Sequence, residues 1–443
     1  MPIGCIRASR RDWPQLDNVT HTLIGALVGE AVARAARPRS PSPAVAAAAR
    51  ARLPDGSFRR LVVVTLTVGS NLPDADLIYT SFAGGPLAYV LQHRGYTHSL
   101  PGALLGAGLL WLACLVWVRA RHQEASGPEK AWIAVAAVAG VLLHLAMDYT
   151  NSYGVHPFWP FYDGWVYGDS VYIVEPLLWL AAAPLIFVLD TRVARSLVAA
   201  ALAAAALAVV GFGLVATPAS IVFVLLGAAM LAAGRWLRPA VSLAWGIGLW
   251  LGVTLLFGIA GRVAGARLDA AAMAQFPDAH TLDRVLTPTP ADPVCWDAWL
   301  VQAQPGVEVM RQARISLLPG LIGVGQCRGV EPGAAARTVA VALPAPVPSG
   351  IQWRQQFTLP ADRIARLART QCRARAFMQF ARVPLAWTEG PDWWLGDLRF
   401  GARGRGFSQV QLGRVPAPCD FAPVPWLPPR PELLAPPDSP DRP

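Results

Sequence analysis

The chain has 443 residues, enough for two or three domains. Hydrophobic residues make up 54% of it and charged residues only 15%, whereas a soluble domain carries about 25% charged residues. This composition argues against a wholly water-soluble chain. The net charge of +10 comes mainly from Arg in short stretches between apolar segments, without a phosphate loop, zinc-finger spacing or basic stripe. We therefore expect membrane lipid, and no nucleic acid, as a partner.

Apolar segments predict an all-α polytopic membrane bundle of about eight helices, with seven as the alternative count. A helix needs about 20 residues to cross the hydrocarbon, so the first and seventh segments are marginal. The segments lie at roughly 19–36, 61–79, 100–118, 131–149, 171–190, 196–216, 219–234 and 240–261.

Basic residues alternate between the two ends of this predicted bundle. One set of connecting segments holds fourteen Lys or Arg residues, from Arg34 to Arg238, and the other holds four. Short loops rich in Lys and Arg stay in the cytoplasm, which places both termini outside. A competing interpretation takes residues 1–36 as a signal peptide, but His21 and Glu30 interrupt its apolar run.

The character of the chain changes after Gly261. Residues 262–415 are rich in Pro and Arg, with β-like runs at 338–343 and 351–359, and predict a soluble, β-rich, extracytoplasmic domain. Residues 416–443 form a Pro-rich tail. Four cysteines in this region predict two disulfides of undetermined pairing, with free thiols as the alternative. They are Cys295, Cys327, Cys372 and Cys419.

Six of the seven histidines lie in the first 160 residues, and the predicted topology places most of them, with several Asp, at the outer ends of the helices. Pro73 interrupts regular helix beside two carboxylates, and His144 and Asp148 share one helical face. Ionisable groups beside hydrocarbon are costly and persist mainly where they pair, bind ions or react. The sequence therefore predicts a metal site. Its candidate ligands are His21, Asp74, Asp76, His93, His98, His144 and Asp148.

These ligands exceed the three or four that one zinc ion takes. Either two divalent ions bind, zinc or alternatively manganese, or one carboxylate or imidazole acts as a general base. We expect Asp76 and Arg94 to be catalytic. Arg94 binds an anionic group or pairs with Asp74 or Asp76. The candidate substrate-binding residues are Arg94, Thr97, Ser99 and Tyr153.

Four motifs in order resemble the YdjM-like family of bacterial inner-membrane metal-dependent hydrolases. They are Asp-Asn-Val-Thr-His-Thr-Leu at 17–23, Pro-Asp-Ala-Asp at 73–76, His-Arg-Gly-Tyr-Thr-His-Ser-Leu at 93–100 and the stretch from His144 to Gly154. The resemblance covers about residues 17–190, and the seven candidate ligands lie at its matching positions. It implies a metal-dependent hydrolase in the inner membrane. Residues 1–16 precede the pattern and are expected to be an over-extended start, and residues 191–261 add further helices.

The reaction expected from the resemblance is hydrolysis at the membrane surface. A phospholipid or lipid-linked phosphoester is the preferred substrate, because the site lies at headgroup depth beside Arg94. Two other classes stay open, a transporter and a metal-stabilised structural or regulatory protein. A transporter would carry ionisable residues near the middle of its helices, whereas here they gather at one end. The oligomeric state stays open as well.

Overall fold

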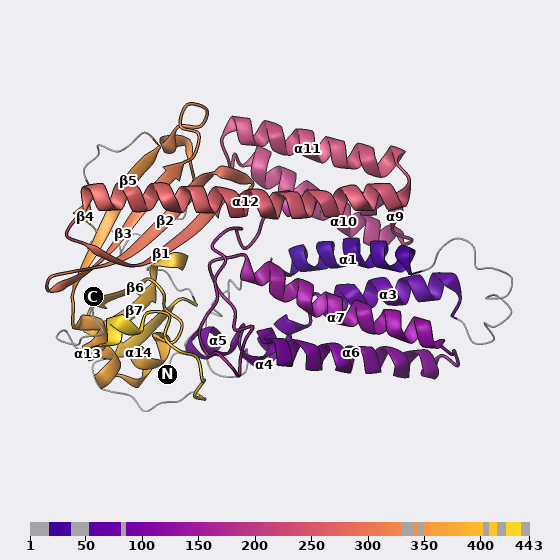
Figure 1. The fold of residues 1–443 in the computed structure, drawn as a ribbon, viewed down its shortest axis with the longest axis horizontal. Helices are drawn as coiled ribbons and strands as arrows, with labels where there is room; N and C mark the ends of the chain where they lie inside the picture. Colours follow the sequence, from indigo (N-terminus) through magenta and orange to yellow (C-terminus); the bar gives the residue numbers. More distant parts are fainter. Residues whose placement is uncertain are drawn as a thin grey trace, which may run out of the picture.

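The computed structural model describes residues 17–36, 53–80, 86–328, 341–343, 350–401, 407–413 and 422–435. Figure 1 shows helices side by side in one part of the molecule and antiparallel sheets in the other, with one long helix running through both. The expected start at residues 1–16, half of the Pro-rich tail and Cys419 lie outside the described residues.

Helices form throughout the predicted membrane region. Short 3-10 turns, η1 (Pro73–Ala75) and η2 (Tyr96–His98), connect some of them, and α10 is followed by a π-helical turn at Leu207–Gly211. The helices are α1 (Asp17–Ala35), α3 (Asp55–Gly69), α4 (Asp76–Thr80), α5 (Pro86–Gln92), α6 (Leu100–Ala120), α7 (Gly127–Tyr149), α8 (Pro176–Leu180), α9 (Leu185–Val188), α10 (Arg192–Ala206), α11 (Thr217–Trp236) and α12 (Pro239–Gln275).

The number of membrane spans is lower than predicted. Within the described residues, five helices are long and apolar enough to cross a membrane, or six if α3 and Pro73–Thr80, bent by 58°, form one broken span. The prediction of eight or seven spans is therefore wrong. Residues 176–188 form only the short helices α8 and α9, too short for a hydrocarbon layer about 30 Å thick. Helix α1, which covers the first predicted span, is not among the five, and it contains the charged residues Glu30 and Arg34.

Small residues let the helices around the site approach closely, as is common in membrane bundles. Helices α3 and α7 cross at Gly69 and Gly140, where a Cβ on Gly140 would lie 2.7 Å from the Leu66 carbonyl oxygen. Helix α1 meets α3 in the same way, because a Cβ on Gly25 would lie 2.1 Å from Ser70 Oγ. These contacts bring the ends of α1, α3 and α7 together.

The C-terminal region consists of two antiparallel sheets and short helices, which confirms the prediction that it is β-rich. The first sheet has the order β1-β2-β3-β5-β4 and the second β6-β7-β8. The elements are β1 (His280–Thr289), β2 (Asp292–Gln304), β3 (Val307–Ser316), β4 (Val341–Ala342), β5 (Ile351–Pro360), α13 (Arg363–Thr370), α14 (Cys372–Phe377), β6 (Pro384–Glu389), β7 (Asp392–Asp397) and β8 (Gln409–Gly413).

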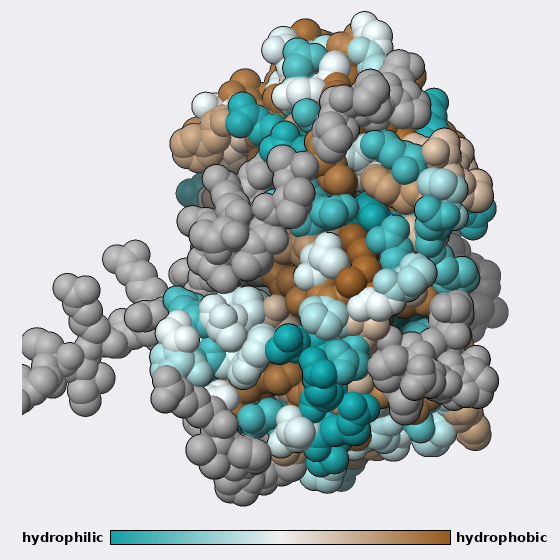
Figure 2. Space-filling view, turned by 90° about the vertical axis from the view of Figure 1, so that its left-hand side faces the viewer, coloured by the Kyte–Doolittle hydropathy of each residue, from teal (hydrophilic) through white to brown (hydrophobic). Residues whose placement is uncertain are grey.

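Helix α12 joins the two parts. It continues past Gly261 to Gln275, and its Ala264 and Leu268 share a core with Trp296 of β2. Polar and apolar residues are interspersed on the end of the molecule that carries the sheets (Figure 2). Cys295 and Cys327 form a disulfide with Cα atoms 5.3 Å apart, and Cys372 is disulfide-bonded as well.

The two ends of the helix bundle differ in charge. The connections α6–α7, α9–α10 and α11–α12 lie at the end away from the sheets (Figure 1), and they carry the basic residues Arg121, Arg192 and Arg238. Helices α4 and α5 lie at the opposite end, beside the sheets. The candidate site and the C-terminal domain therefore share one end of the bundle.

Candidate metal centre

Five elements bring the candidate ligands together. His21 lies in the first turns of α1, and His144 and Asp148 lie four residues apart near the end of α7. Asp74 lies in η1 directly after Pro73, where the chain bends away from α3, and Asp76 begins α4. His93 and His98 come from the turn between α5 and α6. All seven side chains are buried.

Four of these residues, Asp74, His98, His144 and Asp148, each place one ligand atom within 4.8 Å of the other three. His98 Nε2 lies 3.0 Å from His144 Nε2. It lies 3.3 Å from Asp74 Oδ1 and 3.2 Å from Asp148 Oδ2. The corresponding distances from His144 Nε2 are 3.5 Å and 3.3 Å. Atoms that bind a tetrahedral ion at about 2.0–2.1 Å lie roughly 3.3 Å from one another. These five distances fit a tetrahedral cage, and all four atoms lie within 4.8 Å of one another.

The protonation of both imidazoles follows from their outer partners. His144 Nδ1 lies 2.9 Å from the Ser70 carbonyl oxygen, which can only accept, so Nδ1 carries the proton. Thr97 Oγ1 donates its one proton to Asp76 Oδ2 at 3.0 Å, and therefore accepts from His98 Nδ1, also at 3.0 Å. Both neutral rings then turn an Nε2 lone pair toward the centre of the cage.

The cage fits a divalent cation. Two lone pairs 3.0 Å apart repel each other unless a cation lies between them. Asp74 Oδ1 and Asp148 Oδ2 are also buried, and neither has a hydrogen-bond partner in the described part of the chain. Buried acceptors without partners are costly. Two imidazole nitrogens and two carboxylate oxygens are a donor set that zinc and manganese accept.

Asp76 has a different environment from the cage ligands. Its carboxylate accepts from the Arg94 backbone N–H and from Thr97 Oγ1, both at 3.0 Å. It also lies 2.9 Å from His93 Nδ1. Asp74, Asp76 and His93 form a second group whose ligand atoms lie within 4.8 Å of one another. Because Asp76 already accepts from these three partners, its geometry suits holding His93 in place.

His21 and Arg94 contact the outer oxygen of Asp148. His21 Nε2 lies 3.2 Å from Asp148 Oδ1, and its ring stacks on His144 with centroids 4.0 Å apart. Arg94 Nη2 lies 2.8 Å from the same oxygen, so the guanidinium pairs with Asp148. The backbone N–H of Arg94 donates to Asp76 instead. Together these contacts leave Asp148 Oδ2 directed at the cage.

The other predicted site residues lie close by in different roles. Thr97 links Asp76 to His98, as described. Ser99 Oγ caps α6 by accepting from the Gly102 backbone N–H at 3.1 Å, which suits a structural role. Tyr153 is buried, and its ring lies 4.8 Å from the Arg94 guanidinium carbon.

Several contributing groups were not predicted. The carbonyl of Ser70 is one, and a backbone atom leaves no signal in the sequence. Asn151 Oδ1 accepts from Arg94 Nη1 at 3.0 Å; its position three residues after Asp148 could have suggested it. Trp426 of the C-terminal domain stacks on His156 beside the site, at a sequence distance that no local pattern reveals.

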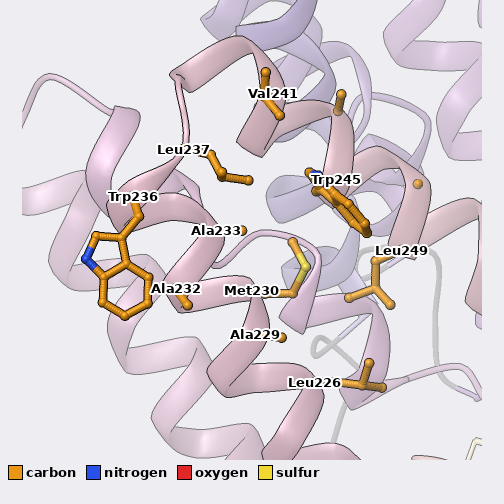
Figure 3. Close-up of a pocket in the computed structure, with 12 residues that line it drawn as sticks. Leu226, Ala229, Met230, Ala232, Ala233, Trp236, Leu237, Val241, Trp245 and Leu249 are labelled. Atoms are coloured by element: carbon orange, nitrogen blue, oxygen red, sulfur yellow. The ribbon is translucent and has the colours of Figure 1, made fainter.

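An apolar groove lies elsewhere, between α11 and α12 (Figure 3). It has a volume of about 1010 Å³ and is lined by residues such as Met230, Trp236 and Trp245. None of the described residues that line it is titratable, so these residues offer no groups for acid, base or metal chemistry.

The fold and the cluster define a polytopic membrane protein with a potential metal site at one end of its helices. The family model for the YdjM inner membrane protein matches residues 16–219, which confirms the resemblance drawn from the four motifs. The uncharacterized protein YfhP of Bacillus subtilis (strain 168) is 24% identical over 127 residues, which cover 29% of this chain and 36% of that protein. The chain thus matches about a third of this curated relative's length. No solved structure matches it.

Proposed function

We propose that the protein is a metal-dependent hydrolase of the inner membrane that acts on a phospholipid or lipid-linked phosphoester. The observation that carries the proposal is the cage of Asp74, His98, His144 and Asp148, whose ligand atoms lie close enough together to surround one ion. Zinc is the preferred ion, with manganese as the alternative. A bound ion would supply Lewis-acid polarisation of a phosphoryl oxygen.

We assign the role of general base to His93. Its Nδ1 donates to the Asp76 carboxylate at 2.9 Å, which leaves Nε2 as the nitrogen that takes a proton from an attacking water. Asp76 orients the ring, as the carboxylate does in a Ser-His-Asp triad. Arg94, 2.8 Å from Asp148, supplies positive charge beside the cage for an anionic substrate. Thr97 and Tyr153 hold His98 and Arg94.

The side of the membrane follows from charge and redox chemistry. Basic loops gather at the end of the bundle away from the site, which favours a cytoplasmic position for that end. The disulfide between Cys295 and Cys327 favours an oxidising compartment for the C-terminal domain. We therefore propose that the domain and the metal centre face the outside, where lipid headgroups are accessible.

A second candidate function is a structural metal site. Four protein ligands in a closed, buried arrangement are typical of structural zinc, whereas catalytic zinc usually keeps one position open for substrate. The side chains of His98 and His144 are 0% exposed, which favours this alternative. Under it, metal would stabilise the helices without turnover.

The experiment that separates the two functions uses purified full-length protein in mixed micelles with phosphatidic acid, a lipid pyrophosphate and bis(p-nitrophenyl) phosphate. Metal-loaded wild type should hydrolyse at least one of them, and chelation should abolish turnover. His93→Gln should lower the rate by roughly 10²–10⁴ with its metal content unchanged. If metal-loaded wild type cleaves none of these probes while metal raises its unfolding temperature, the structural role stands instead.

A further inference from the structure

The C-terminal domain contacts the turn between α5 and α6 through Trp426. The buried indole Nε1 donates to the Leu91 carbonyl at 2.8 Å, and the ring stacks on His156 with centroids 4.0 Å apart. A Cβ on Gly95 would lie 2.9 Å from Trp426 Cζ2. Gln379 Nε2 donates to the Trp426 carbonyl at 2.9 Å. Trp426, in the described part of the Pro-rich tail, is therefore fixed by the C-terminal domain and packs closely on the turn.

A second contact comes from Arg399 and reaches the loop after α7. Arg399 Nη1 donates to the carbonyls of Ser152 at 2.7 Å and Tyr153 at 3.4 Å. Its guanidinium is paired with Asp397 at 2.8 Å, and both side chains are 0% exposed. A buried, paired guanidinium is a rigid donor, so it holds the backbone of this loop in place.

Both contacts lead to Arg94. His156, under Trp426, donates from Nδ1 to the Arg94 carbonyl at 3.1 Å. Asn151, in the loop held by Arg399, accepts from Arg94 Nη1 at 3.0 Å. The φ of Arg94 is +58°, a left-handed conformation that a non-glycine residue keeps only where its surroundings hold it. Arg94 in turn contacts Asp148 of the cage at 2.8 Å.

We propose that Trp426 and Arg399 are positioning residues of the metal centre. Through His156 and Asn151 they hold Arg94 on Asp148, so the C-terminal domain completes a site whose ligands all lie in the membrane region. Both residues lie outside the part of the chain that matches the family model. The proposal deepens the proposed function, and only its metal readout rests on that function.

Hydrogen exchange of the full-length protein in detergent tests the proposal with and without metal. The Arg94 amide donates to Asp76, so peptides covering residues 91–99 report directly on the turn. Trp426→Ala should speed their exchange by roughly tenfold or more, because it removes a buried hydrogen bond and a ring stack. Trp426→Phe, which keeps the ring, should restore part of the protection.

Trp387→Ala is the matched control, because Trp387 is a buried tryptophan of the same domain that packs on Trp394 of the neighbouring strand. It should leave exchange of residues 91–99 unchanged. If Trp426→Ala does not fold, Arg399→Lys keeps the charge beside Asp397 and should speed exchange at residues 150–154. Unchanged exchange in these variants, or an equal effect of Trp387→Ala, would overturn the proposal.

The metal readout is separate. For manganese-loaded protein, transfer of the ion to a chelator should be several-fold faster in Trp426→Ala than in wild type, because the variant loosens Arg94, the outer partner of Asp148, and such partners support metal affinity. If wild type binds no metal, the proposed function fails, yet the exchange result still decides whether Trp426 and Arg399 position Arg94.

Discussion

Each imidazole of the cage depends on a partner on its outer side. His144 Nδ1 donates to the Ser70 carbonyl and His98 Nδ1 to Thr97, so both Nε2 atoms are left for a cation. Such partners set the tautomer and orientation of metal-binding histidines. Of the two partners, the Thr97 hydroxyl is the one to remove by mutation, because it links His98 to Asp76 without itself being a ligand.

Thr97→Val removes this hydroxyl with little change in shape. We expect metal affinity to fall about 10–100-fold, because His98 Nδ1 loses its nearest acceptor and the ring is no longer held. Thr97→Ser, which keeps the hydroxyl, should bind metal as wild type does. Competition with a chelator of known affinity measures both. Equal affinity of Thr97→Val and wild type would show that the Thr97 hydroxyl does not hold His98, whose Nδ1 also lies 3.4 Å from Asp76 Oδ2.

Helix contacts set the distance between the ligands. Asp74 follows α3 and His144 lies on α7, and the two helices cross where Gly69 meets Gly140. A Cβ on Gly140 would lie 2.9 Å from Gly69 Cα. Backbone atoms cannot move aside as a flexible side chain can, so any larger residue must push the helices apart.

Gly140→Ala should therefore destabilise the protein by about 1–3 kcal/mol, the usual cost of overpacking, and weaken metal binding. The unfolding temperature and metal content in detergent measure the two effects. Gly108→Ala on α6 is the control, because a Cβ there meets nothing within 4 Å, and it should resemble wild type. Normal metal binding by Gly140→Ala would show that this crossing does not set the geometry of the cage.

Another contact between elements should depend on pH. Glu175 precedes α8 and accepts from the Ala291 backbone N–H at 2.9 Å, in the turn between β1 and β2. Burial raises the pKa of Glu175 from 4.5 to about 8. A raised pKa favours the folded state while the group is protonated, so this contribution is lost as the pH rises through about 8.

The unfolding temperature of wild type should thus fall from about pH 5 to about pH 8 more steeply than that of Glu175→Gln, which cannot ionise. Thermal unfolding in detergent at several pH values makes the comparison. Parallel curves for the two proteins would show that Glu175 is not held in this buried environment.

At the scale of the whole molecule, the sequence predicted the two-part architecture and many of the residues that meet. Spacing placed His144 and Asp148 on one face of a helix, and Pro73 marked the bend beside Asp74. The span count failed because hydropathy does not reveal that residues 176–188 break into two short helices. The packing of Trp426 on His156 was not predictable, since contacts across such a sequence distance leave no periodic signal.

The proposed orientation makes a prediction for the whole chain. A reporter active only outside the cytoplasm should work when fused to the C-terminus and fail when fused after Gln123, between α6 and α7. Basic residues should retain that loop inside. The reverse pattern would place the metal centre on the cytoplasmic side and remove the redox argument for the disulfides.

The central claim is that Asp74, His98, His144 and Asp148 bind one divalent ion. Elemental analysis of detergent-purified protein tests it most directly, with His98→Ala and Asp148→Ala compared with His280→Ala, whose histidine is exposed on β1. We predict close to one ion per chain in wild type and His280→Ala, and far less in the two cage variants. Absence of metal from wild type, or equal metal content in all four proteins, would contradict the account.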